Sequence, residues 1–194
     1  MNYAPCTQDK DWTNGMADTM MKNLDHVAYR FMIIDDSGSM SIFDGNLYMV
    51  APNGKGKMVK SSRWQELVQA INFHAEFADI AQAPTEFRFL NSSGPIVVGD
   101  SADDDGRARA HLTKVLSGGP SGGTPLCKQV TEIANKVRMM APELKQRGQL
   151  ASVTIFTDGQ SSDGGTSHLP RPHCMYLYAL VRARVTGLVC QYQH

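Results

Sequence analysis

Two apolar segments of the chain each end at an aspartate. The first, His26–Ile34, is apolar or β-branched almost throughout, and Asp35 and Asp36 follow it directly. The second, Leu150–Thr157, leads in the same way into Asp158. Short, nearly unbroken apolar segments are typical of parallel strands that are buried on both faces. The pattern therefore predicts two inner strands whose carboxyl ends carry acidic side chains.

Helical periodicity is found in three segments between these strands. Residues 61–82 form the first, with Ser62 and Gln65 spaced as a capping box. Residues 103–118 predict a short helix with acids at its start, where they favour the helix dipole. The third is Pro125–Met140, where Thr124 occupies an N-cap position and Pro125 the first helical position. The apolar positions recur at helical spacing: Trp64, Leu67, Val68, Ile71, Ala75 and Ala78, then Leu126, Val130, Ile133, Val137 and Met140. We also expect Phe73, Phe77 and Ile80 to be buried, on a second face of the first helix.

Two hairpins complete the expected elements. Asn53-Gly54 is a strong turn signal between "NLYMV" and "KGKMV". "TEFRFLN" alternates like a strand, and "PIVVG" is its expected hairpin partner. The first hairpin has two interpretations, a surface elaboration or a lid that contacts a partner beside the end of the first strand.

The alternation of strands and helices predicts an α/β fold. We expect a doubly wound, mostly parallel central sheet flanked by helices. Residues 1–23 are polar and weakly patterned, so we expect an irregular N-terminal lead-in, followed by a single domain over residues 24–194. The part of that domain after about residue 160 is atypical, because it has poor amphipathic order.

Composition narrows the classes of function. Lys plus Arg and Asp plus Glu both number 19, so the formal net charge is zero and no bulk attraction to nucleic acid or to an anionic membrane is expected. The sequence shows no membrane-spanning run and no secretory signal. Its 4 cysteines form no C-x-x-C pair, which indicates reduced thiols and a cytoplasmic protein.

The residues that follow the two inner strands suggest a metal site. Asp35 and Asp158 end the strands, Ser37 and Ser39 lie just beyond Asp35, and Thr124 lies in a glycine-rich loop. Ligands of open α/β sheets bind at the carboxyl ends of the strands, so these five side chains are expected to converge. All are hard oxygen donors, which suit Mg²⁺, with Mn²⁺ or Ca²⁺ as alternatives, better than zinc.

In their order and spacing, "DDSGS", "GGTP" and "FTDG" resemble the metal-ion-dependent adhesion site of the von Willebrand factor A domain family. The resemblance covers about His26 to Gly159 and implies a Rossmann-like fold. It implies that Ser37, Ser39 and Thr124 ligate the metal through their hydroxyls, and that Asp35 and Asp158 act largely through water. The remaining ligand of the ion would be an Asp or Glu of a partner protein.

The function expected from this resemblance is a metal-dependent protein-binding module that is not an enzyme. Two alternatives stay open: a metal-dependent hydrolase or phosphotransferase with Asp35 as its nucleophile, and a structural domain whose metal site is idle. A zinc site from His168, His173, Cys174, Cys190 and His194 fits no structural-zinc spacing. The segment after Gly159 is short for the helix, strand and closing helix that the family calls for. We therefore expect a fold that is either truncated there or closed differently, with "TGLVCQYQ" as one further strand.

Overall fold

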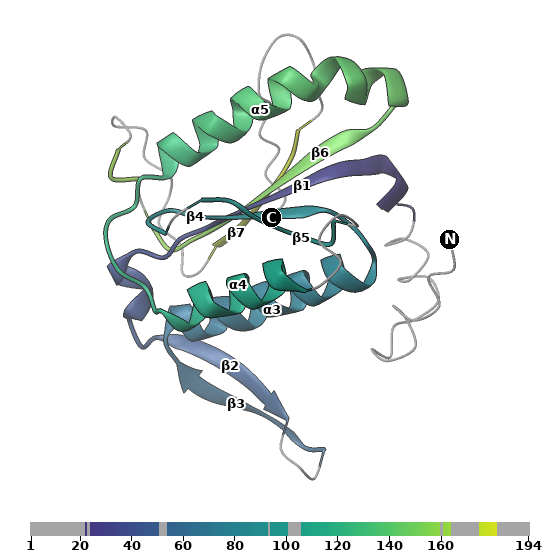
Figure 1. Ribbon diagram of the computed structural model, residues 1–194. Helices are drawn as coiled ribbons and strands as arrows, with labels where there is room; N and C mark the ends of the chain where they lie inside the picture. Colours follow the sequence, from purple (N-terminus) through teal and green to yellow (C-terminus); the bar gives the residue numbers. More distant parts are fainter. Residues whose placement is uncertain are drawn as a thin grey trace.

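The computed structural model has a mixed five-stranded sheet with helices on both faces (Figure 1). It describes residues 22, 24–50, 54–92, 94–100, 106–159 and 161–163, together with the backbone of residues 175–181. The strand order in this sheet is β5-β4-β1-β6-β7. The three inner strands are parallel to one another, and both edge strands run antiparallel to their neighbours. The predicted α/β class with a mostly parallel, helix-flanked sheet is confirmed at this level, and the arrangement is compatible with a Rossmann-like fold.

The two apolar segments that end in aspartate are adjacent in the sheet. Strand β1 (Val27–Ile34) lies between β4 (Thr85–Phe89) and β6 (Leu150–Thr157). In the register, Ile34 faces Phe89 on one side and Phe156 on the other. The strands therefore end at nearly the same level, and the residues after β1 and β6 come out at the same edge of the sheet.

Alternate residues of β1 pack against different helices. Met32 and Ile34 belong to a core cluster that contains buried residues of α3 (Arg63–Ile80) and α4 (Arg107–Ser117). Phe31 and Ile33 belong to a second cluster with buried residues of α5 (Leu126–Arg147). Figure 1 shows the same division, with α5 on one face of the sheet and α3 and α4 on the other. Both faces of β1 are thus buried, which accounts for its nearly unbroken apolar sequence.

Helix α3 begins as the sequence predicted. The Ser62 hydroxyl accepts a hydrogen bond from the Gln65 backbone N–H, and the Gln65 side chain accepts one from the Ser62 backbone N–H. This capping box satisfies two N–H groups that have no partner within the helix. Trp64, Leu67 and Ile71 are buried along one face of the helix, as expected. The capping box therefore fixes where α3 starts and the position of Arg63, its first residue.

The expected second buried face of α3 is wrong. Phe73 is 39% exposed and Ile80 is 44% exposed. Phe77 is only partly buried, against a small separate cluster of Ala81 and Ala83. The face of α3 that carries Trp64, Leu67 and Ile71 packs into the core cluster, and a helix can turn only one face to it. Apolar residues on several faces of a helix therefore do not by themselves show that the helix is buried all round.

Both predicted hairpins are present. Strands β2 (Gly45–Val50) and β3 (Gly56–Ser61) form a separate antiparallel pair, which projects beside α3 in Figure 1. Residues 51–53 of its turn lie outside the described residues. Strand β5 (Ile96–Val98) pairs antiparallel with β4. The expected acids at the start of α4, residues 103–105, are also outside the described part.

One strand was not predicted. Strand β7 (Met175–Val181) pairs antiparallel with β6 and forms an edge of the sheet. Three segments lie outside the described residues: "TGLVCQYQ", the lead-in over residues 1–23 apart from Lys22, and the His and Cys residues after residue 164 whose spacing fits no zinc site. None of the helices that are described is long and apolar enough to cross a bilayer.

The contrast between the buried and exposed faces of α3 can be tested with two truncations. Ile71 is fully buried, so Ile71→Ala is expected to lower the free energy of unfolding by about 2–5 kcal/mol, through lost burial and the cavity left behind. Phe73→Ala, two residues away and exposed, is expected to cost less than about 1 kcal/mol. Urea titrations followed by circular dichroism measure both. Equal losses would show that Phe73 is part of the core after all.

Candidate functional site

Two acidic side chains lie next to each other at the carboxyl edge of the sheet. Asp35 follows β1 and is fully buried, and its backbone N–H donates to the Phe156 carbonyl at 2.9 Å. Asp158 follows β6, and its side chain is 3% exposed. A carboxylate taken out of water is costly unless it is hydrogen-bonded or paired with a cation. The partners of these two groups therefore decide what the site can do.

Asp35 is held by hydrogen bonds from neutral groups on both sides. Its Oδ1 accepts from the Ser37 backbone N–H at 3.0 Å. Its Oδ2 accepts from the Thr157 hydroxyl at 2.7 Å, so Asp35 is tied to the end of β6 as well as to its own loop. Within the described residues no Lys, Arg or His contacts this carboxylate. Two neutral donors stabilise it, and the described part of the chain provides no counter-ion for its charge.

The two predicted serines connect the loop after β1 to Asp158. The Ser37 and Ser39 hydroxyls are 3.1 Å apart. The Ser39 hydroxyl in turn donates to Asp158 Oδ1 at 3.0 Å, across 119 positions of sequence. The side-chain oxygens of Ser37, Ser39 and Asp158 are thus linked to one another, and Asp35 joins them through the Ser37 backbone N–H. These four of the five predicted residues are called here the strand-end cluster.

Arg63 is part of the site and was missed in the sequence. Its Nη1 donates to Asp158 Oδ2 at 2.6 Å. Its Nε and Nη2 donate to the two carboxylate oxygens of Asp44, at 2.8 and 2.5 Å. The hydrogen bond to Asp44, followed by that to Asp158, raises the pKa of Arg63 above its ordinary value, so the guanidinium stays charged. Arg63 therefore provides a positive charge at one end of the strand-end cluster.

Thr124, the fifth predicted residue, is close to the cluster but not joined to it. Its loop contacts the β1 loop through the backbone, since Gly38 N–H donates to the Gly122 carbonyl at 3.1 Å and Ser121 N–H donates to the Asp36 carbonyl at 2.7 Å. The Thr124 backbone N–H donates to the Ser162 hydroxyl at 3.1 Å, and the Thr124 carbonyl accepts from the Ser162 backbone N–H at 2.8 Å. Among the described residues, its hydroxyl makes no hydrogen bond to the strand-end cluster.

The expectation that Thr124 caps the following helix is wrong. Helix α5 begins at Leu126 with Pro125 in the capping position, and neither Pro125 nor Thr124 caps it with a side chain. The side chain of Asp163 does so instead, because its two oxygens accept from the Cys127 and Lys128 backbone N–H groups at 3.0 and 2.9 Å. The acid is 36 residues from Cys127 in sequence, beyond the reach of a local motif. The Thr124 hydroxyl therefore has no capping role to compete with ligation.

Asp36, the neighbour of Asp35, has a different role. Its Oδ1 accepts from the backbone N–H and the side-chain amide of Asn91, and its Oδ2 accepts from the backbone N–H and hydroxyl of Ser92. All of these bonds go to the loop after β4. The Asn91 amide also reaches the Gly123 carbonyl at 2.8 Å. Asp36 thus joins the loops after β1 and β4 and the glycine-rich loop, which makes it a structural rather than a ligating residue.

Gly122 shows why that loop is rich in glycine. Its φ is +92°, a conformation that is unfavourable for residues with a Cβ. A Cβ at this position would lie 2.6 Å from Asn91 Oδ1, closer than the two atoms can approach. Glycine therefore lets the loop pass next to Asn91 while its carbonyl accepts from Gly38.

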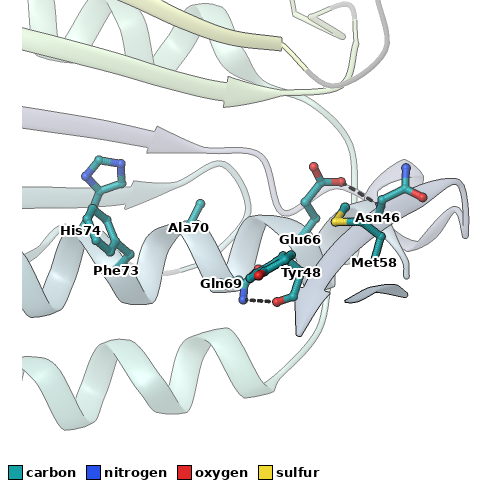
Figure 2. Close-up of a pocket in the computed structure, with 8 residues that line it drawn as sticks. All are labelled: Asn46, Tyr48, Met58, Glu66, Gln69, Ala70, Phe73 and His74. Atoms are coloured by element: carbon teal, nitrogen blue, oxygen red, sulfur yellow. Dashed lines mark hydrogen bonds between the residues drawn. The ribbon is translucent and has the colours of Figure 1, made fainter. Parts of the chain in front are cut away.

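A groove lies between the hairpin and α3, away from the strand-end cluster. Figure 2 shows it, a groove of about 670 Å³ lined by Asn46, Tyr48, Met58, Glu66, Gln69, Ala70, Phe73 and His74. Gln69 Nε2 donates to the Tyr48 carbonyl at 3.0 Å, which fastens β2 to the helix. Burial lowers the pKa of His74, so this ring is neutral at pH 7. The groove contains no paired acid and base, and its lining includes none of the five predicted site residues.

The described part of the chain contains no group of three or more His, Cys, Asp or Glu side chains placed to hold a metal ion. The strand-end cluster differs from such a group because half of its members are serines. No family model, curated protein or solved structure matches this chain in the comparisons made.

The capping role of Asp163 gives a prediction that includes its pH dependence. Asp163→Ala should lower the free energy of unfolding by about 1 kcal/mol at pH 7, because two backbone N–H groups of α5 lose their acceptor. The hydrogen bond from Ser161, followed by those from Lys128 and Cys127, lowers the pKa of Asp163 from 3.8 to about 2. A lowered pKa means that this stabilisation is present above about pH 4 and disappears as the pH falls toward 2.

The control for this prediction is Thr124→Ala, measured without added metal. It should change stability by less than about 0.5 kcal/mol, since no cap is lost. Denaturant titrations at pH 7 and at pH 3 compare the two variants with the wild type. A larger loss for Thr124→Ala than for Asp163→Ala would restore Thr124 as the cap.

Proposed function

We propose that this chain is a divalent-metal-dependent protein-binding module of the von Willebrand factor A type, with its metal at the strand-end cluster. The observation that supports the proposal best is the Ser37–Ser39–Asp158 connection, because it joins two loops that the motifs predicted to converge. The placement of Asp35 and Asp158 on neighbouring parallel strands gives further support. The family assignment itself rests on the motifs of the sequence.

The side chains fit a hard divalent cation. Asp35, Ser37, Ser39 and Asp158 present oxygen atoms only, as Mg²⁺, Mn²⁺ and Ca²⁺ prefer. Asp35 and Ser37 are buried, with exposed fractions of 0% and 2%, so an ion beside them would be partly desolvated. Asp35 lacks a cationic partner among the described residues, and Asp158 shares its own with Asp44. The strand-end cluster therefore favours added positive charge.

Each residue has a definite part in this proposal. Ser37 and Ser39 would offer their hydroxyl oxygens, and Asp35 and Asp158 would supply negative charge through their carboxylates. The bound ion would supply a positive centre that attracts one further carboxylate, an Asp or Glu from a partner protein. Thr124 is the remaining candidate ligand. Its hydroxyl is not joined to the cluster, so ligation by Thr124 would require a small shift of the glycine-rich loop. That loop is connected to the loop after β1 by the hydrogen bond from Gly38 to Gly122.

An idle metal site is the second candidate, and Arg63 is the observation that favours it. The guanidinium already compensates part of the charge of Asp158, as an internal ion pair would in a purely structural domain. We do not propose catalysis by Asp35, because this side chain is fully buried and therefore out of reach of a substrate. A nucleophile must contact its substrate, with a base or an activating group nearby.

Metal binding is tested by heat and by calorimetry. Mg²⁺ is expected to bind at one site per chain and to raise the melting temperature. At a free Mg²⁺ concentration of one hundred times the dissociation constant, binding should add about 2.7 kcal/mol to the free energy of unfolding. Asp35→Asn removes a charge while keeping the size of the side chain, and it should abolish the shift. Asp79→Asn is the matched control, because Asp79 lies near the end of α3 with its side chain 53% exposed. Identical melting in chelator and in excess Mg²⁺ would favour the idle site.

Partner binding is tested on beads that carry the purified chain. We expect a protein from a cell lysate to be retained in Mg²⁺, released by chelator, and not retained by Asp35→Asn beads. Once the partner is identified, replacement of its contacting Asp or Glu by Asn or Gln should abolish binding, because an amide lacks the negative charge that the ion attracts. Retention that survives the chelator would mean that the partner binds elsewhere on the chain.

A further inference from the structure

Arg63 holds two carboxylates at once. Its Nε and Nη2 bind both oxygens of Asp44, and its Nη1 binds one oxygen of Asp158. The two partners differ in exposure, since the Asp44 side chain is 43% exposed and that of Asp158 only 3%. The fork-shaped contact to Asp44 is the geometry in which arginine binds a carboxylate best, and it leaves a single hydrogen bond to the buried acid.

That single hydrogen bond goes to a carboxylate of the strand-end cluster, whose negative charge would help to hold the metal. Asp158 Oδ1 already accepts from Ser39, and Oδ2 is the oxygen that Arg63 uses. A guanidinium and a divalent ion on the same carboxylate repel each other, by several kcal/mol at 4 Å for an effective dielectric of about 20. The two cations therefore compete for Asp158.

We propose that Arg63 is an internal counter-ion that competes with the divalent metal for Asp158 and so sets the affinity of the site. The inference rests on the proposed function. Arg63 neutralises Asp158 while no ion is bound and withdraws toward Asp44 when one binds. Because both contacts to Asp44 remain, the withdrawal breaks only one of the three hydrogen bonds of the guanidinium.

This competition also favours divalent over monovalent cations at the site. A monovalent ion brings no more charge to Asp158 than the guanidinium it displaces, so the exchange gains little. A divalent ion brings one additional positive charge next to Asp35, which has only neutral donors among the described residues. Arg63 thus makes the strand-end cluster respond to divalent cations in the presence of abundant Na⁺ or K⁺.

The decisive experiment compares Mg²⁺ affinity, by calorimetry, in the wild type and in Arg63→Gln. Removal of the competing charge should tighten Mg²⁺ binding by about tenfold, the scale of one hydrogen bond to a charged group. The same variant without metal should melt at a lower temperature than the wild type, because Asp158 loses its only cationic partner among the described residues. Affinity and metal-free stability therefore change in opposite directions, which a merely structural arginine would not produce.

The matched control is Arg147→Gln. Arg147 forms an exposed pair with Glu143 at 2.9 Å on α5 and does not contact the cluster. It should leave Mg²⁺ affinity unchanged within twofold. A second measurement needs only the wild type: the ¹⁵N resonance of Arg63 Nε should shift on Mg²⁺ addition, while that of Arg147 stays in place.

The outcomes separate the two proposals. If Mg²⁺ binds equally tightly to the wild type and to Arg63→Gln, or if the Arg63 resonance does not move on binding, Arg63 is not a competitor, although the metal site stands. If Mg²⁺ binds to Arg63→Gln alone, the competition is confirmed, but the proposed function fails, because the metal site of the wild type is then idle. If neither protein binds Mg²⁺, the proposed function fails and the inference fails with it.

Discussion

The structure depends on keeping two carboxylates at the ends of neighbouring buried strands. Asp35 and Asp158 come out at one edge of the sheet because β1 and β6 are parallel and end in register. Both side chains are almost wholly withdrawn from water, where a charge is costly. The surrounding loops supply what water would have supplied: a backbone N–H, the hydroxyls of Thr157 and Ser39, and one guanidinium.

The loops that supply these donors are themselves held by Asp36. Its carboxylate takes four hydrogen bonds from Asn91 and Ser92, and its carbonyl accepts from Ser121. The consecutive aspartates after β1 thus have different roles. Asp35 belongs to the strand-end cluster, and Asp36 holds the surrounding loops in place. A site fixed in this way needs little rearrangement when a ligand arrives, which lowers the cost of binding. The loop of Thr124 is the exception, because its hydroxyl is outside the cluster.

Most of the fold could be predicted because it follows from local patterns. The apolar segments gave β1 and β6, and the Ser62–Gln65 box gave the start of α3. The prediction failed where a partner distant in sequence replaces a local one. Thr124 had the spacing of a cap, but Asp163 occupies that position in space. Arg63 pairs with an acid 95 positions away and carries no signal of its own. Residues 175–181 do carry the apolar signal of a strand, and β7 was missed because the region around it has poor amphipathic order.

The choice between a working and an idle metal site depends on how completely Arg63 neutralises the buried carboxylates. A structural ion pair would be expected to match one cation with one buried acid, yet Arg63 makes its better contact with the exposed Asp44. An exposed ion pair of this kind contributes little to stability, so stabilisation of the fold does not account for the contact between Arg63 and Asp44. Asp35, the more deeply buried acid, has no cation at all among the described residues. Charge compensation in the strand-end cluster is therefore partial, and the hydroxyls of Ser37 and Ser39 extend from Asp158 toward the loop that follows Asp35. Partial compensation beside free oxygen lone pairs is what a site needs if it is to accept a divalent ion and release it again.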